Sequence, residues 1–402
     1  MIQELNYLAK VASKEIRNLD NQTRNNVLAD FSSLLVLKYK EILFANSIDL
    51  ENNPNLSESL KDRLALTKDR IIGIANGVKQ LIELEDPINE VIEERVINSG
   101  IKLVKKSVPI GVVGIIYEAR PNVTADCFAL CFKSGNACVL KGGKEAYVTS
   151  SKIVELIKLA LAKNNVNENA VVLLPKISHE ETKELMEDKE NIDLLIPRGS
   201  KRLIQSVVDN ATVPVIETGA GVCHIYVDET ADFEMAKKII INAKTSRPSV
   251  CNAMECLIVN EAIKDEFLPL IIKELKNKNV IIHGDYQGLL PVDDYHTEYD
   301  DLEMNLKIVK DVYEAVEHIE TYSTHHSEAI ISNNQNNVDY FMNNIDSACL
   351  YHNASTRFSD GFEFGLGAEI GISTQKLHAR GPMGLKALTT YTYLLYGNGE
   401  VR

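Results

Sequence analysis

The chain has 402 residues, of which 45% are hydrophobic and 25% are charged, a composition typical of globular proteins and not of disordered ones. This length exceeds what one compact core usually accommodates, so we expect two or more domains. The net charge of −14 argues against a general attraction to nucleic acid or anionic membranes. No apolar run approaches the ~18 residues of a membrane span.

The cysteines and the start of the chain predict a reduced, cytoplasmic setting. Seven cysteines without regular spacing do not form a disulfide framework. The first residues lack the basic segment and apolar block of a signal peptide. Cys127 and Cys131 share a helix face, but no further Cys or His completes a zinc-binding spacing. We therefore interpret both as core residues and predict no metal site.

Residues 2–90 predict helices, because apolar residues recur there at spacings of three and four, as between Leu5 and Leu35. Polar segments at 18–22 and 47–54 separate these helices. The tripeptide Asn98-Ser99-Gly100 then lies between β-forming residues and predicts a hairpin near 96–108. We expect this hairpin to project as an oligomerisation element.

From Gly111 onward, short apolar segments alternate with amphipathic ones. Such alternation is typical of a parallel sheet with helices on both faces, and ligands bind at the carboxyl ends of its strands. The expected strands are 111–116, 137–141, 170–174, 193–197 and 213–217. The expected helices are 123–132, 145–162, 180–188 and 200–208.

A second α/β lobe follows. Its expected strands are 255–259, 280–283, 307–309, 329–332 and 348–351, and its expected helices are 233–243, 267–275, a segment ending at 322, and 336–345. A β-like segment at 223–228 precedes this lobe. The sequence thus predicts two doubly wound lobes, 1–227 and 228–365, with a C-terminal segment over 366–402 that returns to the first lobe and takes part in oligomerisation.

Two loops after predicted strands have the chemistry of phosphate sites. Lys141-Gly-Gly-Lys144 combines two cations with two flexible residues. Pro197-Arg-Gly199-Ser200 opens a helix, where free backbone N–H groups attract anions. Each is equally compatible with a solvated turn. The usual dinucleotide fingerprint is absent, because Gly219-Ala-Gly221 lacks its third glycine and precedes a β-like segment.

Cys251 lies between a predicted helix and a predicted strand, at the start of the second lobe. Arg247 precedes it by four residues, and a nearby cation lowers the thiol pKa from its usual ~8.5 towards the reactive thiolate form. The residues alone leave open whether Cys251 is a nucleophile or a small buried hydrophobe. Cys256 lies inside the next strand and is interpreted as core. Residues 353–371 form a long Gly-rich stretch of the kind that is usually functional.

Several motifs now combine: Ser134-Gly-Asn-Ala-Cys-Val-Leu-Lys-Gly-Gly143, Thr218-Gly-Ala-Gly-Val-Cys-His224, Arg247-Pro-Ser-Val-Cys-Asn252, and the segments 109–124, 196–199 and 353–384. With them the chain resembles the aldehyde dehydrogenase superfamily over nearly its whole length. More closely, it resembles the γ-glutamyl phosphate reductase (glutamate-5-semialdehyde dehydrogenase) family of proline biosynthesis. The resemblance implies an aldehyde-dehydrogenase-like α/β fold, with a cofactor-binding lobe followed by a catalytic lobe.

The resemblance also implies roles for individual residues. Cys251 matches the catalytic nucleophile, and Asn122 matches an oxyanion donor, although a helix N-cap is an equally good interpretation of Asn122. The positions that match NADPH-binding residues are Lys141, Gly199, Ser200 and Glu298. Lys141 and Lys144 favour NADPH through the charge of its 2′-phosphate, whereas the adjacent Glu145 opposes it.

The implied reaction is the NADPH-dependent reduction of L-glutamyl 5-phosphate to L-glutamate 5-semialdehyde, through a cysteine thioester and with release of phosphate. An anionic substrate needs cations, and the arginines in matched loops are Arg120, Arg247, Arg357 and Arg380. Which of them binds phosphate and which the α-carboxylate stays open. Glu217 lies near the base of hydrolytic relatives, and we interpret it as structural or close to the cofactor.

Bifunctional relatives carry a kinase domain ahead of the reductase, whereas this chain starts at the reductase. The resemblance therefore implies glutamate 5-kinase as a separate partner protein. It also implies a homo-oligomer. Two alternatives remain. One is another thiol-dependent aldehyde dehydrogenase, and the other is an inactive scaffold for the kinase. The joint presence of Cys251, Lys141 and Glu298 argues against the scaffold.

Overall fold

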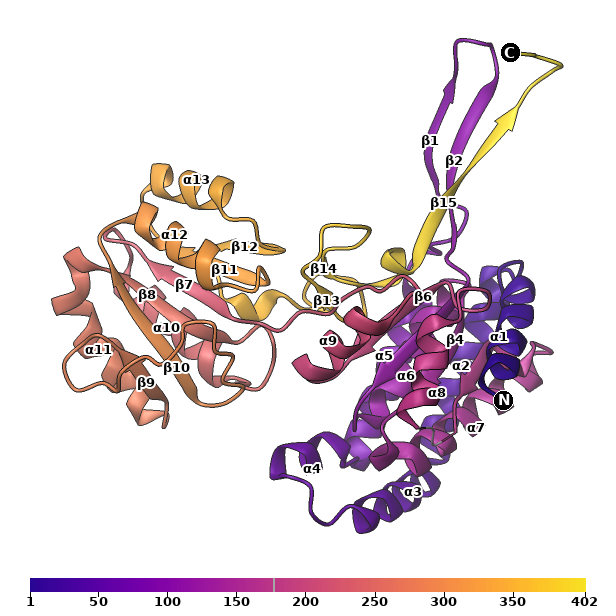
Figure 1. Cartoon of the computed structure of the whole chain (residues 1–402), viewed down its shortest axis with the longest axis horizontal. Coiled ribbons are helices and arrows are strands. Elements are labelled where there is room, and N and C mark those ends of the chain that lie inside the picture. Colours follow the sequence, from indigo (N-terminus) through magenta and orange to yellow (C-terminus); the bar gives the residue numbers. More distant parts are fainter. Residues whose placement is uncertain (176–177) are drawn as a thin grey trace. The chain divides into compact units, whose positions relative to one another are not determined.

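The structure of the chain is a computed structural model that describes residues 1–175 and 178–402. The described chain divides into two compact units, whose elements are labelled in Figure 1. Unit 1 comprises Met1–Thr218, Gly365–Gly371 and Met383–Arg402. Unit 2 comprises Gly219–Phe364 and Ile372–Pro382.

Unit 1 contains a four-stranded parallel sheet in the order β5-β4-β3-β6. Its strands are β3 (Val112–Tyr117), β4 (Ala137–Lys141), β5 (Val171–Leu173) and β6 (Leu194–Arg198). Every residue of β3 is buried, as expected for an apolar strand covered on both faces. The helices that alternate with these strands are α6 (Pro121–Lys133), α7 (Tyr147–Lys163), α8 (His179–Glu187) and α9 (Lys201–Asn210).

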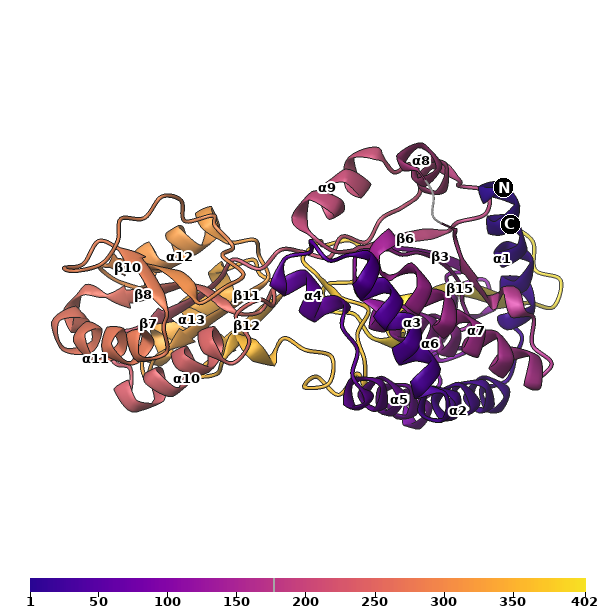
Figure 2. The same cartoon turned by 90° about the horizontal axis from the view of Figure 1, so that it is seen from below.

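Five helices precede this sheet: α1 (Ile2–Ile16), α2 (Asn21–Leu37), α3 (Tyr39–Asn52), α4 (Glu58–Leu64) and α5 (Lys68–Glu83). The N-cap side chains of Asp20 and Thr67 accept hydrogen bonds from backbone N–H groups at the starts of α2 and α5, which fixes where these helices begin. Helices α2 and α5 pack on each other and on α6, which adds an outer helical layer to unit 1 (Figure 2). Phe31 and Phe128 join the layers edge to face at 5.7 Å between ring centroids.

A separate three-stranded antiparallel sheet belongs to unit 1, in the order β1-β2-β15. Its strands are β1 (Val91–Val96), β2 (Lys102–Pro109) and β15 (Thr389–Tyr396). The predicted hairpin is confirmed, with Gly100 at a φ of 87° in its turn, although its first strand begins earlier than predicted. The C-terminal strand pairs with β2 and so joins the hairpin as its third strand.

Unit 2 is built on a six-stranded parallel sheet in the order β12-β11-β7-β8-β10-β9. The strands are β7 (Cys223–Val227), β8 (Met254–Asn260), β9 (Ile281–Gly284), β10 (Glu303–Val309), β11 (Ser327–Ile331) and β12 (Cys349–His352). The helices are α10 (Phe233–Thr245), α11 (Lys264–Asn277), α12 (Val312–Tyr322) and α13 (Gln335–Asn344).

The two faces of the unit 2 sheet bury different side chains. Ile225 and Leu257 join a cluster with α10 and α11, whereas Tyr226 and Ile258 join a cluster with α12 and α13 (Figure 1). Successive residues of a strand point to opposite faces, so these neighbours are divided between two layers of helices. This is the doubly wound arrangement predicted from the sequence, and the α/β fold class is confirmed.

One predicted element is wrong, because residues 213–217 do not form a strand. They make a single parallel bridge, Leu195 to Val215. Pro214 accepts a bond from Leu195 but has no N–H to extend a ladder. The first segment of unit 1 ends at Thr218, ahead of the boundary expected at 227, because β7 pairs with β8 and β11 of unit 2.

Cys127, Cys131 and Cys256 are buried, as predicted. Among the described residues, no helix is both long enough and apolar enough to cross a membrane.

Candidate active site

Cys251 lies in the connection between α10 and β8, where the chain enters the central part of the unit 2 sheet. It is partly exposed, whereas the other six cysteines are buried. A thiol must be reachable to act as a nucleophile, and buried structural cysteines are inert. Accessibility therefore separates Cys251 from the other thiols of the chain.

A buried ion pair joins the two ends of this connection. Lys244 Nζ in the last turn of α10 lies 2.8 Å from Glu255 Oε2 on β8, and both side chains are almost fully buried. Burial raises the pKa of Glu255 to about 8, while Lys244 opposes that rise. Removing one partner of such a pair leaves the other polar group buried without compensation. The pair thus holds the helix end and the strand start together around Cys251.

The backbone of Cys251 packs directly on Gly221. A Cβ atom added to Gly221 would lie 1.4 Å from the Cys251 carbonyl oxygen, so only glycine fits. The Gly221 N–H donates to Glu298 Oε1 at 2.7 Å, and the Cys223 thiol donates to the Cys251 carbonyl at 3.2 Å. Glu298, predicted to bind cofactor, therefore lies beside the turn that supports Cys251.

Two arginines accompany Cys251 in unit 2. Arg357 interacts electrostatically with both Arg247 and Cys251. Burial lowers the pKa of Arg357, the like charge of Arg247 lowers it further, and Asp360 and Cys251 raise it. Arg247 is exposed. Arg357 therefore lies within electrostatic range of both Cys251 and Arg247.

Asn252 fixes Arg357 in this arrangement. Its side-chain oxygen accepts from the Arg357 guanidinium, and its amide donates to the Ser359 carbonyl at 2.9 Å. Arg357 Nε also donates to Ser246 Oγ at 3.2 Å. The start of the Gly-rich stretch is thus tied to the residue that follows Cys251.

Arg380 has a different environment. It is exposed and donates to Asp346 through Nη1 at 2.8 Å and to the Asp346 carbonyl through Nη2 at 2.7 Å. Lys376 and Arg380 lower the pKa of the Asp346 carboxyl to about 2. These contacts form a surface ion-pair cluster, and they do not bring Arg380 to Cys251.

In unit 1, the predicted phosphate loops converge on a carboxylate. Glu118 accepts from the Ser200 N–H at 2.9 Å and from Ser200 Oγ at 2.8 Å, at the start of α9. A Cβ atom on Gly199 would lie 2.8 Å from this carboxyl group. Burial lowers the pKa of Lys141, and the carboxylates of Glu145 and Glu118 oppose that shift. Lys141, Gly199 and Ser200 are therefore brought together around an anion supplied by the chain itself.

Arg120 and Asn122 lie at the start of α6. Arg120 is the N-cap residue, and Asn122 lies inside the first turn, so the N-cap interpretation of Asn122 is wrong. The Asn122 amide donates to Asp126 Oδ2 at 3.2 Å, where burial raises the pKa of Asp126 to about 6. Glu217 is partly buried in the irregular segment that ends unit 1.

The fold and the cysteine loop define the class of the protein. The model of the aldehyde dehydrogenase family matches residues 2–285. The chain belongs to the aldehyde dehydrogenase family of oxidoreductases, whose members use a nicotinamide cofactor.

Individual relatives of the chain share a more specific name within this family. A gamma-glutamyl phosphate reductase of Ligilactobacillus salivarius is 49% identical, over 100% of this chain and 99% of its own length. One of Agathobacter rectalis is 50% identical, over 97% of each chain. The crystal structure of a gamma-glutamyl phosphate reductase from Thermotoga maritima superposes with a TM-score of 0.97 at 44% identity, covering 100% of this chain and 99% of that one.

Sequence reasoning missed the residues that hold these groups in place. Glu118 stood in a matched motif, but nothing in the sequence indicated that its carboxylate would meet Ser200 across the strand ends. The contact between Gly221 and the Cys251 backbone also had no sequence signal beyond the glycine itself. Both depend on segments that are distant in the chain.

We expect Gly221→Ala to lower turnover by roughly 10²-fold or more, because its methyl group must push the Cys251 backbone aside. Steady-state kinetics and the alkylation rate of Cys251 by iodoacetamide measure the effect, and circular dichroism reports whether the fold is kept. The control is Gly77→Ala in α5, where an added Cβ meets nothing within 4 Å. Wild-type turnover and alkylation in Gly221→Ala would contradict the constraint.

Proposed function

We propose that this chain reduces L-glutamyl 5-phosphate to L-glutamate 5-semialdehyde with NADPH in proline biosynthesis, releasing phosphate through a thioester on Cys251. The observation that carries the proposal is the partly exposed Cys251 beside Arg247 and Arg357. The full-length relatives named gamma-glutamyl phosphate reductase support the substrate class.

The residue types account for the chemistry. The Cys251 thiolate attacks the γ-acyl carbon, the carbon–oxygen bond to phosphate breaks, and inorganic phosphate leaves with the bonding electrons. Arg247 and Arg357 supply positive charge for the anionic groups of the substrate. Asn122 is the proposed oxyanion donor, and a donor of this kind contributes roughly 10²–10³ in rate in comparable sites. After reduction the carbon–sulfur bond breaks and regenerates Cys251.

A dinucleotide fits the donor set in unit 1. Ser200 N–H, Ser200 Oγ and the Lys141 ammonium are arranged around a carboxylate, and the same donors suit a phosphate at a helix N-terminus. We propose that Gly199 allows close approach and that Glu298 holds the ribose of the nicotinamide. The cofactor, when bound, supplies the hydride that reduces the thioester.

We also propose that the chain forms a homo-oligomer in the cytoplasm through the β1-β2-β15 sheet. All six residues of β1 are exposed, and Tyr391, Tyr393 and Leu395 of β15 are about half exposed. Aromatic and apolar side chains on an open strand surface favour association. Glutamate 5-kinase is the proposed source of the acyl phosphate.

The proposed reaction predicts phosphate dependence in the reverse direction. With glutamate 5-semialdehyde and NADP⁺, we expect NADPH formation only when phosphate or arsenate is present, because the thioester needs that anion as acceptor. Parallel assays with NAD⁺ test the cofactor preference. Equal rates without either anion would contradict the proposal and favour an aldehyde dehydrogenase that transfers the acyl group to water.

The same assay tests the nucleophile. We expect Cys251→Ala to abolish turnover while NADPH binding, followed by its fluorescence, is retained. Cys127→Ala, which removes a buried thiol of unit 1, is the matched control and should keep turnover. Turnover in Cys251→Ala would refute the assignment of Cys251 as the nucleophile. Loss of turnover in this variant with intact NADPH binding would also exclude a purely scaffolding role for the chain.

A further prediction concerns Glu118. Its charge occupies the anion position at the start of α9, so a bound phosphate must displace it. We expect Glu118→Gln to tighten NADPH binding about two- to fivefold, since charge at a helix N-terminus is worth 0.3–1 kcal/mol. Fluorescence titration measures the Kd, with the exposed Glu155→Gln as control. Weaker binding would show that Glu118 holds the loop in its binding-competent form.

A further inference from the structure

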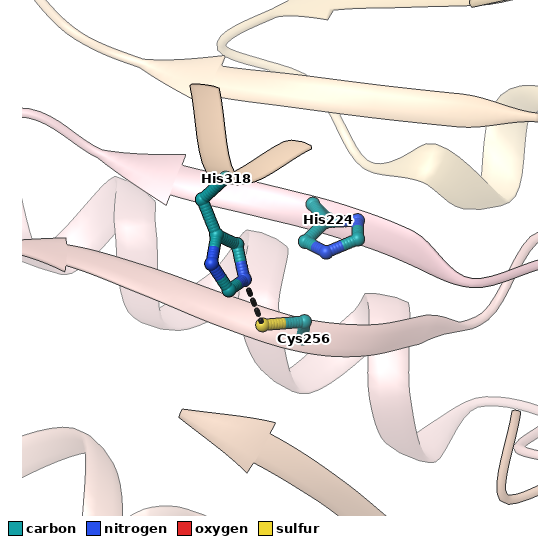
Figure 3. Close-up of side chains that lie close together, drawn as sticks. All are labelled: His224, Cys256 and His318. Carbon is teal, nitrogen blue, oxygen red and sulfur yellow. Dashed lines mark hydrogen bonds between the residues drawn. The ribbon is translucent and has the colours of Figure 1, made fainter. Parts of the chain in front are cut away.

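A second group of reactive side chains lies inside unit 2 and includes none of the residues assigned to catalysis. His224 on β7, Cys256 on β8 and His318 on α12 each offer one ligand atom, and these atoms lie within 4.8 Å of one another. All three residues are buried. Figure 3 shows the two imidazole rings on the side of the strands where the Cys256 sulfur lies.

The spacing of these atoms fits a tetrahedral metal ion. Cys256 Sγ lies 3.7 Å from His318 Nε2. With metal–sulfur and metal–nitrogen bonds of about 2.3 and 2.05 Å, a tetrahedral zinc ion separates such ligands by about 3.6 Å. All three ligand atoms lie within 4.8 Å of one another. Small movements of the side chains would therefore bring them to the distances that three bonds to one ion require.

Glu328 on β11 contacts His224. Its Oε2 lies 3.3 Å from His224 Nδ1 and accepts from the His224 backbone N–H at 2.7 Å. Ser323 and Ser347 also donate to this buried carboxylate through their hydroxyl groups. A carboxylate facing one nitrogen of a histidine leaves the other nitrogen for a metal, which is the usual arrangement around protein zinc.

The protein satisfies the ring nitrogens of His224 only in part. Both are buried and neither makes a hydrogen bond of good geometry, and the contact of Nδ1 with Glu328 is an ion-pair contact at 3.3 Å. Buried polar atoms of this kind are costly and call for an explanation such as an ion.

We propose that His224, Cys256 and His318 supply three of the four tetrahedral ligands of one Zn²⁺ ion, with Glu328 orienting His224, at a site that joins β7, β8 and α12. A thiolate and two imidazoles are the donor types that zinc prefers. Binding displaces the thiol proton of Cys256 and any proton on His224 to solvent, so affinity falls as the pH falls. The site stabilises the strand that follows the Cys251 connection and takes no part in the reaction.

The test uses the full chain with Cys251→Ala, which removes the partly exposed thiol as a competing ligand. Zinc content is measured after purification, and Co²⁺ is then titrated into metal-free protein while absorbance and melting temperature are followed. We expect one equivalent of Co²⁺, a sulfur-to-cobalt charge-transfer band, and a melting temperature that rises with Co²⁺ concentration.

Variants assign the ligands. Cys256→Ser should remove the charge-transfer band, and His318→Gln should weaken binding at least 10²-fold. Glu328→Gln should weaken it about 10- to 100-fold, as for other groups that orient metal ligands. Cys349→Ser, which alters another buried cysteine of unit 2, is the matched control and should bind normally.

Two outcomes would overturn the proposal. One is the lack of bound zinc together with the lack of a charge-transfer band during the Co²⁺ titration. The other is a band that persists in Cys256→Ser. If a variant fails to fold, the titration of the parent protein still decides between a metal site and a hydrogen-bonded packing cluster.

Discussion

The position of Cys251 depends on a contact between two backbones. The carbonyl of Cys251 lies where the side chain of any residue but glycine at position 221 would have to be. Glu298 holds that glycine through its N–H, and the buried Lys244–Glu255 pair closes the connection on its other side. The partly exposed thiol is therefore carried by a segment that is fixed at both ends and by the Gly221 contact. The proposed nucleophile would need such a fixed position to meet its substrate in one orientation.

Local charge in this chain differs from its overall charge. The net charge is −14, yet Arg247 and Arg357 gather at Cys251. At the start of α9 the arrangement is reversed, because Glu118 fills a position that suits a phosphate. The proposed anionic substrate would therefore meet cations that are already in place, whereas the proposed dinucleotide phosphate would have to compete with the Glu118 carboxylate. The two binding events thus carry different electrostatic costs.

The sequence predicts the elements better than their contacts. Apolar segments such as 112–117 and 254–260 are strands because no polar face interrupts them, and the pattern is visible without the fold. Residues 213–217 have the same apolar character and fail as a strand, because Pro214 cannot continue a ladder. Motif residues near Cys251 were predicted through the family resemblance. Glu118 and the His224–Cys256–His318 group were not, since each is created by strands and helices that meet only after folding.

Cys251 and Cys256 are close in sequence but lie in different environments. Cys251 precedes β8 and stays partly exposed, whereas Cys256 lies inside β8 and is buried with α12 and α13. Alternation along the strand turns Cys256 to one defined face, where His318 of α12 also lies. An ion held there would be enclosed by the α12 layer, while the thiol of Cys251 remains partly open to solvent. The sheet would therefore keep the proposed metal-binding thiolate and the proposed nucleophilic thiolate apart even though they are close in sequence.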